Sequence, residues 1–258
     1  MDVTSCWDDN MLHGCREEII RLSRRCSRCH EYCCRFLAAA GSLAGDTYRI
    51  ALDGVNTAKL AGYCGRLAER EYKPWKKAPG IEQVRFLTAV TNKGVWKFTD
   101  TAKQLCDRIY LINDESGAVS RLLLGNMRRD ALAAGYDVIS CYCPLSPFEK
   151  LEQLFIPALR LGFMTSNRFH DFSLEIDPYR IVNAQRFTDP EKVKSSKKRL
   201  NFNRKVMAQM IDQAQLLLKE AKSVHDELEG YYISATDFKK VEALTQTVLS
   251  QVESFEAY

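Results

Sequence analysis

The stretch RIYLINDESGAVSRLLLGNM, residues 108–127, has the outline of a phosphate-binding loop. The apolar run 108–113 predicts a buried strand, and the periodic pattern from about 118 to 133 predicts an amphipathic helix that stops at Gly135. A strand, a short polar loop and a helix N-terminus form the local arrangement in which backbone N–H groups bind phosphate. The order of elements therefore predicts the position of a phosphate loop.

The residues that give such a loop its chemistry are missing. A P-loop needs glycines that let the backbone surround the phosphates, a lysine that neutralises them, and a Ser or Thr hydroxyl that binds magnesium. When the pattern is anchored on Ser120, the hydroxyl is the one functional group that remains. The lysine and the two glycines of the pattern then fall on Val119, Ala118 and Asn113.

Two carboxylates make phosphate binding less favourable still, because Asp114 and Glu115 lie where phosphate oxygens would go. Shifting the pattern by one residue gives Gly117 a role but again leaves no lysine. We therefore interpret the segment as a vestigial phosphate loop. Its candidate nucleotide-binding residues are Asn113, Ser116, Gly117, Ala118, Val119, Ser120 and Arg121.

The surrounding sequence predicts an α/β core. Residues 84–100 read as two strands around a turn at 91–94, and DVISCYC, residues 137–143, reads as another strand. From Leu151 we expect a short helix, followed by a buried strand at 161–165. Two strands joined by one crossover helix are the βαβ unit of a parallel sheet.

Two helical segments of similar sequence pattern flank this core. Residues 16–52 read as one continuous helix, and an offset of 181 residues aligns it with the segment that begins at Asn201. The same offset holds through a break and into a second helix, which indicates an internal duplication. We expect a helical hairpin at 1–72, a linker at 73–82, the α/β core at 83–190 and a C-terminal helical hairpin at 191–258.

Composition limits the classes of function. The chain has 258 residues, 46% of them hydrophobic, and a net charge of +4 with 27% charged residues, too small an excess to indicate a nucleic-acid partner. The run 192–199 carries five positive charges without interleaved aromatic residues, which favours a solvated lead-in to a helix. No signal peptide or membrane span is visible, so we expect a cytoplasmic protein without a membrane partner.

Ten cysteines are numerous for such a chain, and without an export signal we expect reduced thiols. The segment CSRCH matches the haem-attachment spacing and could also hold zinc. The same residues fall at helical spacing on an apolar face, which favours core thiols over a metal site. The candidate metal ligands are Cys26, Cys29, His30 and Cys33.

The order of motifs resembles a family of bacterial, mainly Clostridium-type, P-loop ATPase-like proteins. The resemblance rests on the Thr91–Gly94 turn, the strand–loop–helix at 108–133, the strand after Gly135, the turn at Pro144–Pro147 and the segment YYISATDFKKVEAL. The family has two tandem P-loop cores, each with a helical appendage. The resemblance implies that residues 83–258 are the second copy and that residues 14–72 are the helical tail of the first. We expect either a chain that starts late or a segment, 1–10, that replaced the first core.

Departures from the family's pattern matter for function. The family's Gly-Lys-Ser loop is matched by Ser120 alone, and Thr165 stands where an aspartate would help to hold magnesium, while His170 is retained. Hydrolysis needs metal and charge neutralisation at the γ-phosphate. We therefore expect no cofactor and no ATPase activity.

Three functional hypotheses follow. The first is a P-loop NTPase-related protein that has lost hydrolysis and acts as a binding or scaffold protein, with a homo-oligomer or another protein as its partner. The second is a residual ATP- and magnesium-binding protein or weak ATPase, in which a partner chain or three arginines supply the missing charge. The third is metal binding by the cysteine cluster. The three arginines are Arg121, Arg128 and Arg129.

Overall fold

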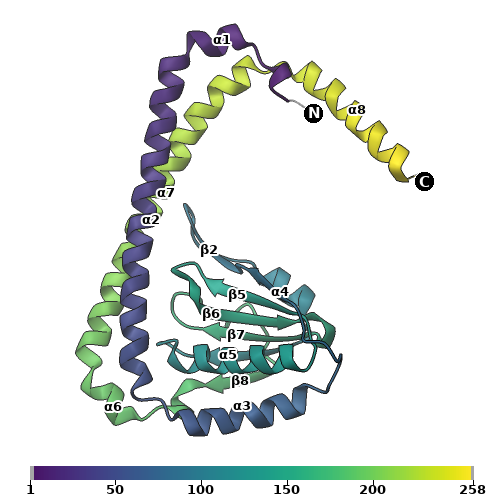
Figure 1. The fold of residues 1–258 in the computed structure, drawn as a ribbon. Coiled ribbons are helices and arrows are strands. Elements are labelled where there is room, and N and C mark those ends of the chain that lie inside the picture. Colours follow the sequence, from purple (N-terminus) through teal and green to yellow (C-terminus); the bar gives the residue numbers. More distant parts are fainter. Residues whose placement is uncertain (1–2, 257–258) are drawn as a thin grey trace. The chain divides into compact units, whose positions relative to one another are not determined.

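The computed structural model describes residues 3–256, which form two compact units. The first, called unit one, comprises residues up to Cys33 together with those from Leu216 onward, and the larger unit comprises Cys34–Gln215. The helices α2 (Arg16–Leu52) and α7 (Lys197–Ala235) each contribute to both units (Figure 1). None of the helices within residues 3–256 combines the length and the apolar character that crossing a membrane requires.

The unit Cys34–Gln215 is an α/β fold built on a six-stranded, mostly parallel sheet. The strand order is β1-β5-β6-β7-β4-β8, and β6 is antiparallel to both of its neighbours. A separate hairpin pairs β2 with β3 around the expected turn at 91–94. The strands are β1 (Glu82–Arg85), β2 (Thr88–Thr91), β3 (Gly94–Lys97), β4 (Arg108–Asn113), β5 (Val138–Cys143), β6 (Ser146–Ile156), β7 (Leu161–Ser166) and β8 (Arg180–Asn183).

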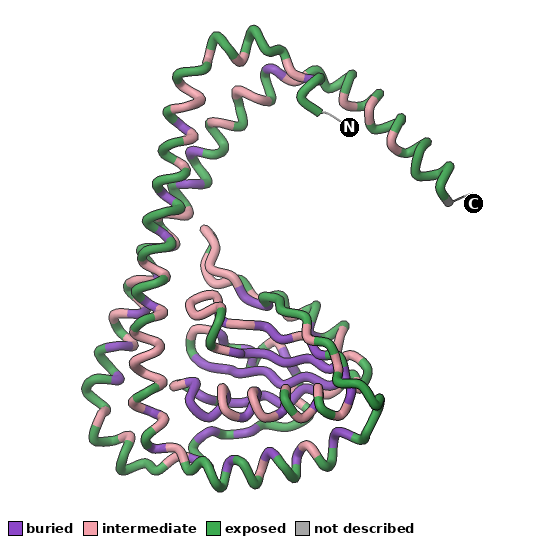
Figure 2. Tube along the Cα trace, in the orientation of Figure 1, coloured by how far each residue is buried: buried purple, intermediate pink, exposed green. Residues whose placement is uncertain are grey.

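Helices cover both faces of this sheet. On one face α3 (Thr57–Glu71) and α5 (Ala118–Ala133) bury a large apolar cluster, and on the other α4 (Thr99–Leu105) buries a smaller one. The central strands are buried along most of their length (Figure 2). At about 25 cal/mol per Å² of apolar surface removed from water, these two clusters provide the main stabilisation of the unit. The sequence-based bounds of β4 and α5 are confirmed, as is Gly135 (φ 88°) at the end of α5.

The structure corrects the expected helix at Leu151. Residues 151–156 belong to β6, the antiparallel strand between β5 and β7, and all six are buried. A short apolar run fits either a buried strand or a buried helix, and burial on both faces of the sheet removes the alternation that would distinguish them. The sheet is therefore mixed rather than wholly parallel.

The helical segments also pair differently from the expected hairpins. α2 lies antiparallel to α7: Arg25 pairs with Glu220 in one unit, and Asp46 pairs with Arg199 in the other. α3 leaves α2 at Asn56, its helix N-cap, and packs on the sheet instead. A local pattern shows which face of a helix is apolar, but it does not show which partner covers that face.

The expected linker runs along the core. Residues 73–81 contain no helix or strand, yet Trp75 and Gly80 donate backbone N–H bonds to the carbonyls of Ala134 and Leu132 at the end of α5. The Trp75 ring stacks on Tyr136 with 5.8 Å between the ring centroids. This segment therefore joins α3 to the sheet as part of the same packed unit.

Unit one consists of helices. It contains the 3-10 helix η1 (Val3–Cys6), α1 (Asp9–Gly14), parts of α2 and α7, and α8 (Phe238–Glu256). A backbone bridge between Trp7 and Thr236 ties its two chain segments together, and the rings of Trp7 and Tyr232 are 5.4 Å apart. The second unit is completed by the 3-10 helices η2 (Pro157–Leu159) and η3 (Ala184–Phe187) and by α6 (Pro190–Ser195).

Candidate functional site

The loop after β4 lies where ligands bind in open α/β sheets. β4 runs parallel to β7 and β8, and Asn113, Ser166 and Asn183 are in register at the carboxyl ends of the three strands. A cavity of about 1010 Å³ opens at these ends and extends to α2 and α7 within the same unit. In sheets of this kind, the crevice outside the carboxyl ends of the strands is the usual ligand position.

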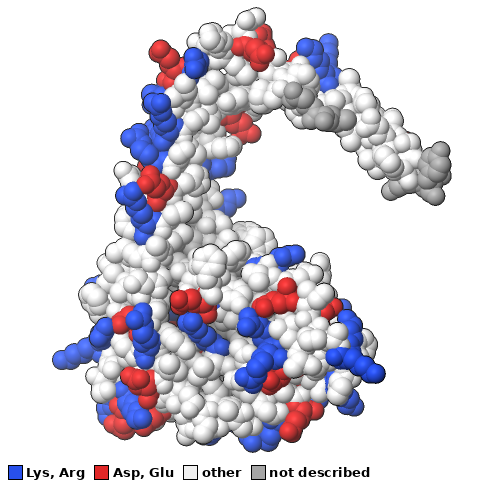
Figure 3. Space-filling view, viewed as in Figure 1, with Lys and Arg blue, Asp and Glu red and all other residues white. Residues whose placement is uncertain are grey.

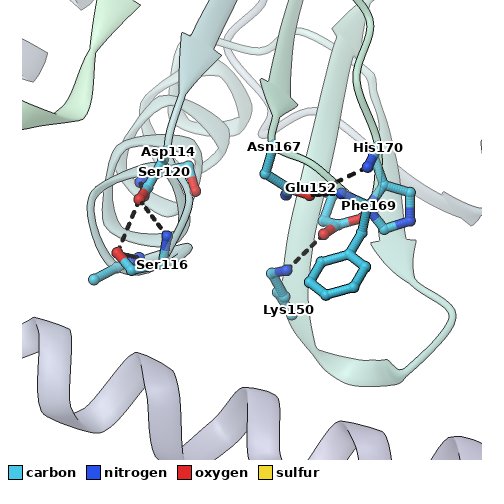
Figure 4. A network of polar contacts seen from close by, with 9 residues as sticks. Asp114, Ser116, Ser120, Lys150, Glu152, Asn167, Phe169 and His170 are labelled. Carbon is cyan, nitrogen blue, oxygen red and sulfur yellow. Dashed lines mark hydrogen bonds and ion pairs between the residues drawn. The ribbon is translucent and has the colours of Figure 1, made fainter. Parts of the chain in front are cut away.

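Asp114 occupies the position that a phosphate would take at the N-terminus of α5 (Figure 4). One carboxylate oxygen accepts the backbone N–H of Ser116 at 3.1 Å and the Ser116 hydroxyl at 2.9 Å. The other accepts the N–H of Ser120 at 2.8 Å, and the residue is only 3% exposed. A negative charge at a helix N-terminus is stabilised by the unpaired N–H groups there. The chain thus fills its own anion position.

The candidate loop residues divide between the cavity and the core. Asn113, Ser116, Gly117 and Arg121 line the cavity. The remaining three are no more than 1% exposed, packed into the first turn of α5, and are not among the described residues that line the cavity. They are Ala118, Val119 and Ser120. The predicted role of the Ser120 hydroxyl as a magnesium ligand is therefore not supported by its placement.

Two positive charges near the loop, Arg121 and Arg168, are already paired. Arg121 lies 3.6 Å from Glu149 and 4.4 Å from the centroid of the Tyr48 ring. Arg168 donates to Glu115 at 2.9 Å. On the face shown in Figure 3, basic and acidic side chains are likewise interspersed rather than gathered by sign.

Arg128 and Arg129 are too far along α5 to serve the loop. They lie in its last two turns, about 12 Å of helix axis beyond the first turn at 1.5 Å per residue. Arg128 donates to Glu82 at 3.0 Å and Arg129 donates to Asn126 at 2.8 Å. The structure therefore does not place these two residues at the loop.

Lys150 is a basic residue of the site that the sequence analysis did not identify. It lies on β6, and its ammonium group is 2.6 Å from a carboxylate oxygen of Glu152 (Figure 4). Its Cε is 3.1 Å from the point that a Cβ on Gly117 would occupy. Burial lowers the pKa of Lys150, but the Glu152 carboxylate outweighs that effect and raises the pKa above its ordinary value, so the side chain is charged. A lysine from another strand thus lies beside the loop.

Thr165 and His170 lie behind the cavity rather than in it. Thr165 is 1% exposed on β7, and the neighbouring Ser166 lines the cavity instead. His170 is 5% exposed, with its Nδ1 3.6 Å from Glu152. Burial lowers the pKa of His170 more than Glu152 raises it, so the imidazole is neutral near pH 7. His170 therefore belongs to a buried polar cluster with Glu152, whereas the Thr165 hydroxyl is buried without a hydrogen-bond partner among the described residues.

The cysteine cluster is part of the packing between α2 and α7. Cys29 and Cys33 are 5% and 3% exposed, and the Cys26 thiol lies 3.8 Å from the carbonyl of Ala221 on α7, whereas His30 is exposed. Within residues 3–256, three or more potential ligand atoms gather within 4.8 Å of one another only at an exposed group on α7. That group is His225, Asp226 and Glu229. The candidate ligands in the cysteine cluster are therefore not brought together.

Comparison of the chain with protein-family models, with curated proteins and with solved structures found no match.

Proposed function

We propose that the protein is related to P-loop NTPases, has no hydrolytic activity, and acts as a binding or scaffold protein. The observation that carries the proposal is the Asp114 carboxylate at the N-terminus of α5, bonded to the N–H groups of Ser116 and Ser120. Each of these charge-assisted bonds is worth roughly 1.5–3 kcal/mol when buried. A phosphate would have to displace them and overcome the repulsion of the carboxylate.

The charges around the loop support the same conclusion. Phosphoryl transfer needs free positive charge at the γ-phosphate. Here Lys150 is paired with Glu152 and Arg121 lies beside Glu149. The cavity at the carboxyl ends of the strands remains available for another ligand or for a protein segment.

Calorimetric titration with ATP–Mg tests this function. We expect no heat of binding at millimolar nucleotide and no phosphate release above background. Binding by the wild-type chain at micromolar ATP–Mg, or turnover that Ser120→Ala abolishes, would contradict the proposal. An Asp114→Ala variant should lose about 3–4 kcal/mol of unfolding free energy because the N–H groups of Ser116 and Ser120 lose a charged acceptor, whereas Glu115→Ala, an exposed neighbour, should change it by less than about 0.5 kcal/mol.

A residual anion site is the second candidate, and it is favoured by the position of Lys150 beside Gly117. In this alternative, Lys150 and Arg121 would supply the charge that the loop lacks, and ATP–Mg would bind weakly. Arg121→Ala would then weaken binding, while Arg129→Ala, at the other end of α5, would leave it unchanged. No change on Arg121→Ala would argue against this candidate.

A further inference from the structure

The two helical segments of the chain, 3–71 and 184–256, contain the same order of helices. Each helix in the second segment begins 181 residues after its counterpart in the first. η1 begins at Val3 and η3 at Ala184, while α1 begins at Asp9 and α6 at Pro190. The long helices α2 and α7 and the last helices α3 and α8 follow the same offset. Their first residues are Arg16 and Lys197, and Thr57 and Phe238.

The offset also relates the backbone contacts inside each unit. In unit one, Asp8 and Asp237 donate their N–H groups across the two chain segments, and in the other unit Asp189 and Asn56 do so at the corresponding positions, all at 2.8 Å. The acceptors are the carbonyls of Ala235, Cys6, Gly54 and Phe187, in the same order. The bridge Trp7–Thr236 likewise corresponds to Val55–Thr188. Two unrelated helix pairs would not share two backbone hydrogen bonds and a bridge at one offset, so we treat the segments as structural counterparts.

The counterparts differ in what covers their last helix. In the larger unit α3 lies against the α/β core, and its side chains Leu60, Cys64 and Leu67 are 1–2% exposed in the same cluster as α5. α8 contains no buried residue among those whose burial is described. Within residues 3–256, an α/β core therefore covers α3, whereas no such core covers α8.

The exposed helix nevertheless has a face of the same kind. The counterparts of Leu60, Cys64 and Leu67 are Val241, Thr245 and Val248. The spacing extends the face along the helix through Leu244, Val252 and Phe255, of which Val252 is 49% and Phe255 82% exposed. From Ala243 to Val252 the helix has no charged residue, and this stretch appears without blue or red in Figure 3. An apolar stripe with this spacing indicates a helix that packs against a partner.

We infer that α8 is a docking helix for a second α/β core, of the fold formed by residues 82–183 but without its own α3-type helix, supplied by a partner protein. A second copy of this chain does not fit, because its core face is already covered by its own α3, where Leu60 and Leu67 are almost fully buried. The inference rests on the proposed scaffold role, for which it names the partner. The docking experiments below measure no nucleotide binding. The docking inference and the proposed function can therefore fail independently of each other.

A version of this chain with an uncovered core serves as the probe partner, and it also carries Val248→Asp so that its own α8 does not occupy that core. Leu60→Asp together with Leu67→Asp should detach α3 from the core, because two charges cannot stay buried in that cluster. Mixed with the wild-type chain, this variant should form a one-to-one complex in size-exclusion chromatography with light scattering. Val248→Asp on α8 of the wild-type chain should weaken the complex more than tenfold. Gln246→Asp, on the opposite side of α8, should not.

A helix transplant tests the same surface if the probe variant fails to fold. Residues 57–71 are replaced by residues 238–252 in the full chain, which keeps the length and the capping position at Asn56. We expect cooperative melting that is lowered by several degrees when the position taken by Val248 carries Asp. Equal melting with and without that charge would overturn the inference. So would a folded probe variant that binds no wild-type chain, or a wild-type dimer that Val248→Asp disrupts.

Discussion

Glu71 is a buried carboxylate that accepts hydrogen bonds from three side chains. It lies at the end of α3, and its side chain is 4% exposed. It accepts from Tyr110 at 2.5 Å, from Arg108 at 2.7 Å and from Arg70 at 3.1 Å. Burial raises the pKa of Glu71, but these three hydrogen bonds outweigh burial and leave the pKa below its ordinary value. The ionised carboxylate thus holds the end of α3 against β4.

This arrangement predicts a pH-dependent contribution to stability. Because the folded-state pKa of Glu71 is depressed, its contribution is complete above the unfolded-state pKa of about 4.3 and is lost as the pH falls through the lower folded value. Glu71→Gln should cost about 2–3 kcal/mol of unfolding free energy at pH 7 and much less near pH 3. Urea titrations at pH 7, 5 and 3 measure the difference. The exposed neighbour Glu69→Gln is the control, and a cost independent of pH would contradict the prediction.

At the residue scale, the sequence shows which P-loop residues are missing, but it does not show which distant side chains contact the loop. Asp114 follows the strand directly, so a carboxylate at the N-terminus of α5 can be predicted locally, although beside Glu115 it reads from the sequence alone as an obstacle to phosphate. Lys150 lies 33 residues after Gly117 in the sequence. The two residues come close because β7 pairs with both β6, which carries Lys150, and β4, which precedes the loop. If 151–156 had been read as strand, the Lys-x-Glu spacing would have placed Lys150 and Glu152 close together on one strand.

At the scale of elements, α5 depends on the left-handed backbone of Gly117. Its φ is 74°, and a Cβ there would lie 3.1 Å from the Lys150 side chain. Gly117→Ala should therefore cost about 1–2 kcal/mol of unfolding free energy. Gly125→Ala, inside the same helix with no atom within 4 Å of the added Cβ, should instead gain about 0.5–1 kcal/mol. Chemical denaturation of both variants measures the two changes in unfolding free energy. A stabilising Gly117→Ala would contradict the need for a left-handed residue at the start of α5.

The bounds of helices and strands with a clear local sequence pattern could be predicted. The elements that they pack against could not. The bounds of β4 and α5 follow from a strand-length apolar run, a helical period and Gly135, all readable within 30 residues. The pairing of α2 with α7 and the packing of α3 on the sheet depend on contacts between distant segments. An apolar helix face is compatible with many partners, and the core that covers α3 is decided by the whole fold.

At the scale of the whole molecule, the two units differ in how much apolar surface they bury. Unit one is helical and has few fully buried side chains, such as Leu22, Cys29 and Val224, whereas the larger unit has two buried clusters around its sheet. Stability follows the apolar area removed from water. Unit one should therefore unfold at lower denaturant, with a midpoint about 1 M urea below that of the other unit.

Cysteine alkylation can follow the two units separately. Burial raises the pKa of Cys106 and Cys141 to about 12 and also raises the pKa of Cys29, so these thiols react at neutral pH only when their unit opens. Pulse labelling across a urea series, read by mass spectrometry, should modify Cys29 before Cys106 and Cys141. Exposed Cys34 should react at every concentration and calibrates the pulse. A common midpoint for all three buried thiols would mean that the continuous helices α2 and α7 couple the units into one cooperative fold. A partner bound to α8 should raise the Cys29 midpoint alone, since it binds only the folded form of unit one.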